Sequence, residues 1–232
     1  MLAYSLDEAP EFLRWQKRLL PLLSVIAGMV DVISFLTLKI FAAHVTGNLV
    51  LIAAVIAEGR RPTLDQDFAV PVFIVATAAV WFLAKTSDRQ DTGRARLLLI
   101  LQFALLTCVL IISTIYHPSR NPGRAISVVD AAVALSAMAC QFAFLRIVIP
   151  GAPTTAVMTG NLSMTVLALL DILAKESSTA EARRQLQKTL PVLLGFFAGC
   201  MAGAAVALQW GDWGWLLPAI AAALAVALVR ES

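Results

Sequence analysis

Six long apolar runs divide this chain and leave little room for any fold except a bundle of membrane helices. They are residues 19–38, 68–84, 97–116, 125–149, 190–210 and 215–229. A bilayer core is crossed by about 20 apolar residues, with about 17–25 tolerated, so the second and sixth runs are near or below the limit. Only 14% of the residues are charged, against about 25% in soluble domains. The sequence therefore predicts an all-α polytopic membrane bundle with six spans.

The tripeptide Thr-Gly-Asn occurs twice, each time directly before a short apolar run. Its copies are Thr46, Gly47, Asn48 and Thr159, Gly160, Asn161. The runs that follow, 49–57 and 162–174, are too short to span on their own. Runs of this size are typical of re-entrant or half-membrane helices. Eight spans remain an alternative, because each helix also crosses if it begins before its tripeptide.

The order of features around the tripeptide is the same in both halves of the chain. Each half has a long apolar run, a break, Thr-Gly-Asn, a short apolar run, a capping-box pattern and then Pro-Val. The capping boxes are Thr63–Gln66 and Ser178–Glu181, and the prolines are Pro71 and Pro191. We therefore predict an internal duplication. Its parts are an N-terminal segment 1–18, a first half 19–116, a linker 117–126 and a second half 127–232.

One loop favours inverted over parallel halves. Residues 85–96 carry four basic side chains, whereas their counterpart, 211–214, carries none. Basic loops stay in the cytoplasm, so inverted halves explain this contrast. We expect a bacterial inner-membrane protein with both termini in the cytoplasm. A short surface helix over 7–18 is predicted before the first span.

The paired tripeptides predict a functional site, because transporters use broken helices whose ends meet near the membrane midplane. Asp31 lies inside the first span, where a carboxylate costs about 2.5–3.5 kcal/mol and must face protein or water. We predict a substrate or ion path lined by Asp31, Thr46, Gly47, Asn48, Gln141, Thr159, Gly160 and Asn161. Two alternatives stay open. The tripeptides cap two short helices only, or Asp31 is a neutral group bonded to Gln102 or Gln141.

Other residues predict packing rather than chemistry. Gly195, Gly199 and Gly203 recur every fourth residue and predict close helix packing, within the chain rather than against a second copy. The three cysteines read as small buried packers, and His44 reads as a solvated loop histidine. No catalytic triad, phosphate loop or metal-ligand pattern is present in the sequence, so we expect neither an enzyme nor a cofactor.

The stretch 28–48 resembles the YoaK-like family of bacterial membrane proteins of unknown function. The matching residues are Gly28, Asp31, Phe35, Phe41 and the first Thr-Gly-Asn, and 139–161 continue the resemblance. That family typically has Gly-x-Gln-Asn-Ala around Gln141, where this chain has Ala139 and Phe142. The resemblance implies a membrane location. Residues 88–96 also resemble, faintly, the cytoplasmic loop of major facilitator transporters.

Our leading hypothesis is a small transporter of a solute or ion that works in the lipid bilayer as a homodimer. The alternative is a non-transporting partner subunit or sensor. Nucleic acid is not an expected partner, because the net charge is only +3 and the basic residues fall in loops.

Overall fold

The computed structural model describes residues 10–86, 91–121, 123–155, 157–175 and 179–229, and over these residues the fold is all-helical. Its helices are α1 (Pro10–Leu38), α2 (Thr46–Ala57), α3 (Leu64–Thr86), α4 (Asp91–Tyr116), α5 (Ala125–Val148), α6 (Met158–Leu173), α7 (Thr179–Trp210) and α8 (Leu216–Leu228). Two 3₁₀ turns, η1 (Pro118–Arg120) and η2 (Gly211–Trp215), complete it. The predicted all-α class is confirmed.

Five stretches are long and apolar enough to cross a membrane. They are 17–38, 64–86, 92–116, 125–148 and 179–228, and the last of these contains α7, η2 and α8. The chain is therefore built as a multi-pass membrane protein. Helices α2 and α6 are shorter and apolar. At 1.5 Å per residue they reach about 18 and 24 Å, less than the roughly 30 Å of a bilayer core.

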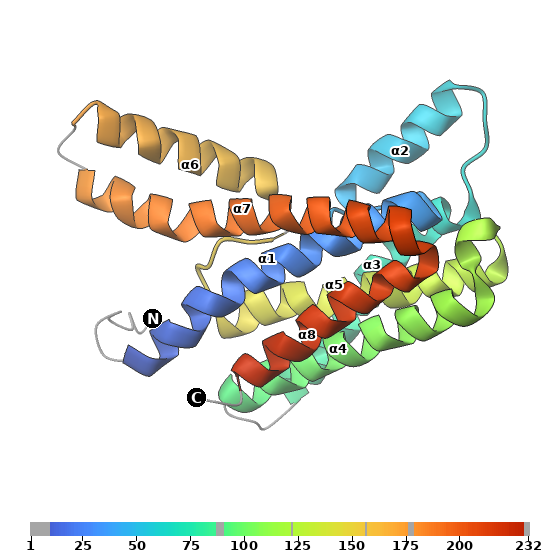
Figure 1. Ribbon diagram of the computed structural model, residues 1–232, viewed down its shortest axis with the longest axis horizontal. Coiled ribbons are helices and arrows are strands. Elements are labelled where there is room, and N and C mark those ends of the chain that lie inside the picture. Colours follow the sequence, from blue (N-terminus) through green and yellow to red (C-terminus); the bar gives the residue numbers. More distant parts are fainter. Residues whose placement is uncertain (1–9, 87–90, 122, 156, 176–178, 230–232) are drawn as a thin grey trace.

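Helices α1, α4, α5 and α8 run along the length of the bundle, α6 lies alongside the first half of α7, and α2 points away from the other helices (Figure 1). We call the end of the bundle where α1 begins and α8 ends the proximal end, and the opposite end the distal end. Helix α2 leaves its break toward the distal end, whereas α6 runs toward the proximal end. The two short helices therefore point in opposite directions.

Helices from the first half of the chain pack against helices from the second half. Helix α1 packs on α7, and its counterpart α5 packs on α3. Helix α4 lies against both α5 and α8, and each short helix rests on the long helix that follows it, α2 on α3 and α6 on α7. The core is therefore shared by both halves of the chain instead of being built twice.

Glycines bring α1 and α7 into close contact. A Cβ on Gly199 would stand 2.2 Å from the carbonyl oxygen of Val25, and one on Gly195 would stand 2.7 Å from that of Pro21. The approach is mutual, because a Cβ on Gly28 of α1 would lie 2.3 Å from the carbonyl oxygen of Phe196. Small residues at this spacing let backbones touch. The third predicted glycine, Gly203, faces the backbone of Met29.

Three local expectations differ from the structure. Helix α1 is continuous from Pro10 through Pro21, so the separate surface helix over 7–18 is wrong for the described residues. Pro71 and Pro191 lie inside α3 and α7, not in their first turns. Helix α3 starts at Leu64, before the predicted start at residue 68. Oε1 of Gln66 accepts the backbone N–H of Thr63 at 3.1 Å, which is one of the two hydrogen bonds of the predicted capping box. Ser178 of the second box lies outside the described residues.

Two carboxylates fasten the chain after α4 at the distal end. Asp65 at the start of α3 accepts bonds from the backbone N–H of Gly123 (2.6 Å) and the hydroxyl of Ser127 (2.9 Å). Asp212 of η2 accepts the hydroxyl of Ser119 at 2.9 Å and lies 3.0 Å from Nδ1 of His117. Both carboxylates are buried. The distal end is therefore tied together across α3, η1, α5 and η2.

Candidate functional site

The first helix break is held by the asparagine of its tripeptide. Residues 39–45 connect α1 to α2, and Lys39 at their start takes a positive φ of 61°. Asn48 is fully buried and turns back on this loop. Its Oδ1 accepts the N–H of Phe41, and its Nδ2 donates to the carbonyl of the same residue, both at 2.8 Å. Neither short helix has a side-chain cap, so the capping role considered for the tripeptides is wrong.

The second break repeats this bond. Residues 149–157 connect α5 to α6, and Nδ2 of Asn161 donates to the carbonyl of Thr154 at 2.8 Å. Each asparagine thus reaches back seven residues to a backbone carbonyl. The threonines of the tripeptides do not take part, because Thr46 and Thr159 are exposed. Their predicted place in a path is therefore not supported by their orientation.

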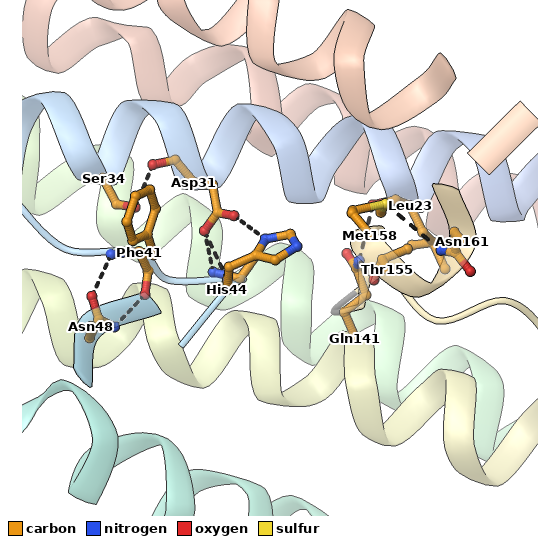
Figure 2. Close-up of polar contacts among 11 residues, drawn as sticks. Leu23, Asp31, Ser34, Phe41, His44, Asn48, Gln141, Thr155, Met158 and Asn161 are labelled. Atoms are coloured by element: carbon orange, nitrogen blue, oxygen red, sulfur yellow. Dashed lines mark hydrogen bonds and ion pairs between the residues drawn. The ribbon is translucent and has the colours of Figure 1, made fainter. Parts of the chain in front are cut away.

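Asp31 is buried beside the first break, with 3% of its surface exposed. It lies about 10 Å before the end of α1, at 1.5 Å per residue. Its Oδ1 accepts the backbone N–H groups of Ala43 (2.6 Å) and His44 (3.1 Å), and its Oδ2 contacts Nδ1 of the His44 ring (Figure 2). Gln102 and Gln141 are not its partners. The expected solvated His44 is also wrong, because its ring faces this carboxylate.

The His44 ring lies between α1 and α7. Its edge meets the ring of Phe196 with centroids 5.0 Å apart. The other ring nitrogen, Nε2, is buried and has no hydrogen-bond partner. The buried Asp31 and the half-buried His44 therefore form an acid–base pair in which one ring nitrogen has no hydrogen-bond partner.

Gln141 joins four parts of the bundle. It is fully buried on α5, and its Nε2 donates to the carbonyl of Leu23 on α1 (3.0 Å) and to the hydroxyl of Thr155 in the second break (2.9 Å). Its Oε1 accepts Nε2 of Gln102 on α4 at 2.7 Å. All the oxygen and nitrogen atoms of this amide are used, so Gln141 ties the second break to the core.

The two polar centres lie in a row along α1, with Asp31, His44 and Asn48 on one side and Gln141, Thr155 and Asn161 on the other (Figure 2). Leu23 and Asp31, the α1 residues they use, are eight positions apart, or about 12 Å along the helix. The breaks therefore approach the same helix from different positions, and both lie within the bundle.

A cavity of about 320 Å³ adjoins the second break. It is lined by Gly151, Ala152, Pro153, Thr154, Val157, Gly160, Asn161, Met164, Gln185, Lys188 and Thr189. Gly160 and Asn161 thus reach a space large enough for a small ligand. Their counterparts Gly47 and Asn48 do not line it.

His44 is the site residue that the sequence analysis missed. It follows Asp31 by 13 positions, a distance that crosses the predicted end of the first span. The available signal was the histidine's place two residues before Thr46 of the first Thr-Gly-Asn, in a loop that must fold back for the next helix to start inside the bundle. Among the described residues no group of three His, Cys, Asp or Glu side chains is placed to hold a metal ion.

Comparison with known proteins places the chain in a family. Residues 19–229 match the model of a family described as protein of unknown function, DUF1275. The chain belongs to this family. The YoaK-like resemblance agrees with the match, which covers all the membrane helices of this DUF1275 member. No curated protein and no solved structure matches it.

Replacing Asn48 by alanine in this DUF1275 protein should lower the free energy of unfolding by about 2–4 kcal/mol. The change leaves the N–H and carbonyl of Phe41 without partners, at about 1–3 kcal/mol each. Reversible unfolding in mixed detergent micelles measures the effect. The exposed neighbour Thr46 provides the control, because Thr46→Ala should stay within about 0.5 kcal/mol of the wild type. Equal losses for the two variants would contradict the role given to Asn48.

Proposed function

We propose that this protein is a small-solute or ion transporter of the bacterial inner membrane, built from two inverted halves with six crossings. One observation carries the proposal. Two short helices begin at breaks inside the bundle and run toward opposite ends (Figure 1). Broken helices of opposite direction, placed at mid-membrane depth, are the arrangement that secondary transporters use around a substrate. The exchange of packing partners between halves supports inversion as well.

The distribution of charge supports cytoplasmic termini. Described basic residues near the proximal end are Arg14, Lys17, Arg18, Lys85, Arg94, Arg96, Arg146, Lys175, Arg183, Arg184 and Lys188, and those near the distal end are Lys39, Arg60, Arg61, Arg120 and Arg124. Basic residues collect on the cytoplasmic side. The proximal end, where both termini-bearing helices α1 and α8 lie, is therefore the cytoplasmic end of the proposed transporter.

Asp31 and His44 are the proposed coupling groups. An ionisable pair at membrane depth is a functional candidate by default. The contacts of Asp31 with the backbone of Ala43 and His44 connect it to the loop that sets the start of α2. A proton bound by the Asp31 carboxylate would remove the charge that accepts these N–H groups, so protonation of Asp31 is the step that loosens the first break in this proposal.

Proteoliposome uptake tests the proposal. Purified protein is reconstituted and offered radiolabelled carboxylates, amino acids, sugars and monovalent cations, with and without a pH gradient. The proposal expects accumulation of at least one class above protein-free liposomes. Uptake equal to that of empty liposomes for every class contradicts transport and favours the partner subunit or sensor. The homodimer stays a prediction, as does the absence of enzymatic activity.

The six-crossing arrangement is tested by labelling single cysteines with a membrane-impermeant maleimide in a variant whose three native cysteines are alanine. We expect Arg60→Cys to be labelled in intact cells and Thr92→Cys only after the membrane is opened. Eight crossings reverse both results. Ser178→Cys is cytoplasmic in either arrangement and controls for membrane integrity.

A further inference from the structure

The cavity lies at the second break, and the two breaks carry different side chains at equivalent positions. Thr154 and Phe41 are equivalent, because each stands seven residues before its asparagine and bonds it through the backbone carbonyl. The Phe41 ring fills the space beside Gly47, where a Cβ would stand 3.0 Å from the ring carbon Cδ2. It also stacks on Phe35, with centroids 4.9 Å apart. At the second break the equivalent residue is the smaller Thr154, which lines the cavity with Gly160, and a Cβ on Gly160 would stand 3.2 Å from Cγ1 of Val157.

The residues around the open space set the charge of what it accepts. Lys188 is the only charged residue among those that line the cavity, and no acidic side chain lines it. Thr154, Asn161, Gln185 and Thr189 add hydroxyl and amide groups. An exposed ammonium group with neutral hydroxyl and amide neighbours favours a ligand with one negative charge. The N-terminus of α6 also lies here, and its partial positive charge adds to the charge of Lys188.

The remaining lining residues set the size and polarity of the uncharged part. Ala152, Pro153, Val157 and Met164 give the cavity an apolar wall. A volume of about 320 Å³ is at the low end for ligand sites, which hold about 300–1,000 Å³. The space therefore suits a few carbon atoms next to the charged group, and not a nucleotide or a sugar polymer.

We propose that the cavity between the second break and α7 binds a small organic monoanion with a short apolar part, anchored by Lys188. The inference rests on the proposed function, since it names the substrate class of the transporter. Lys188 lies in the first third of α7, the part nearest the proximal end. The site is therefore loaded from the cytoplasmic side.

Binding of propionate, of its uncharged analogue propionamide and of propylamine to the full chain tests this proposal. The protein is held in nanodiscs of phosphatidylcholine, so that the lipid supplies no net anion, and calorimetric titration and the melting temperature are measured. Propionate should bind and raise the melting temperature, and the other two should not. Lys188→Gln should weaken propionate binding about tenfold, whereas Lys85→Gln, which removes the same charge away from the cavity, should not.

Thr154→Phe provides a second variant. It should abolish propionate binding by filling the cavity, while the backbone carbonyl still bonds Asn161. Because Lys188 is exposed, Lys188→Gln keeps the test decisive if Thr154→Phe does not fold. Equal binding of propionamide, no binding of propionate at tens of millimolar, or an unchanged affinity in Lys188→Gln would overturn the site. Propionate binding without any solute uptake would leave the site standing and remove the transport function. Uptake of cations alone, without propionate binding, would support transport and rule out the proposed anion site.

Discussion

Leucine in place of Gly199 is expected to prevent the chain from forming a stable bundle. The Cβ of any side chain at this position meets backbone, 2.2 Å from the carbonyl oxygen of Val25 and 2.9 Å from its Cα. A backbone cannot rotate away as a flexible side chain does, so α1 and α7 must separate. Overpacking typically costs about 1–3 kcal/mol and sometimes more, and here a whole isobutyl group is added. We expect a loss of at least 3 kcal/mol, roughly the top of that range.

Size-exclusion chromatography and thermal unfolding in detergent measure this effect. Gly199→Leu should give aggregated protein or a strongly reduced melting temperature, and Gly199→Ala should fall between it and the wild type. Ala205→Leu on the same helix is the matched control, because Ala205 is exposed and its larger side chain enters the surrounding lipid or detergent. A wild-type elution profile and melting temperature for Gly199→Leu would show that the α1–α7 contact is not required.

The glycine spacing shows how much of the packing was predictable. Residues four apart share one face of a helix, so Gly195, Gly199 and Gly203 indicated a close approach from sequence alone. The identity of the partner helix was not predictable. It depends on which distant segment offers a matching surface, and α1 does so with Gly28 and with the backbone of Pro21 and Val25.

At the two helix breaks, too, the sequence predicted the positions of the helices but not the contacts of individual side chains. The apolar runs and the position of each tripeptide predicted where the helices lie. Most helix ends agree to within four residues, but α1, α4 and α7 begin well before their apolar runs, and α8, predicted as a long span, has only 13 residues. The action of the tripeptides was not predicted correctly. Asn48 and Asn161 bond backward to the loop instead of forward to the helix, because the tripeptide already belongs to the first turn. Helix geometry then places Thr46 and Thr159 on the outer side.

The partner of Asp31 illustrates why single residues were harder to place. Sequence reasoning looked for polar groups in other spans and found Gln102 and Gln141. These two amides bond to each other instead. Asp31 is satisfied by residues only 12 and 13 positions later, because the chain after α1 turns back along the helix. Such a return is set by loop geometry, which apolar periodicity does not encode.

Asn in place of Asp31 is expected to abolish uptake driven by a pH gradient while leaving exchange of solute across the membrane intact. The asparagine side chain has the same shape, and its oxygen still accepts the N–H groups of Ala43 and His44. It carries no ionisable proton, so it cannot take up or release the proton that the proposed coupling requires. Proton transfer by a positioned group contributes about a hundredfold or more where it is required, and we expect gradient-driven accumulation to fall by at least tenfold.

The comparison uses proteoliposomes of wild type, Asp31→Asn and Asp171→Asn, with an internal pH dye and the radiolabelled solute that the wild type accumulates. Asp171 is near the end of α6, so Asp171→Asn makes the same chemical change away from the His44 pair and should accumulate solute as the wild type does. Melting temperatures of the three proteins separate coupling from folding, since all are expected to agree within a few degrees. Equal gradient-driven uptake by Asp31→Asn and the wild type would remove Asp31 from coupling. If Asp31→Asn loses both gradient-driven accumulation and solute exchange, Asp31 is a structural residue of the break. Replacing a coupling group abolishes accumulation and leaves exchange intact.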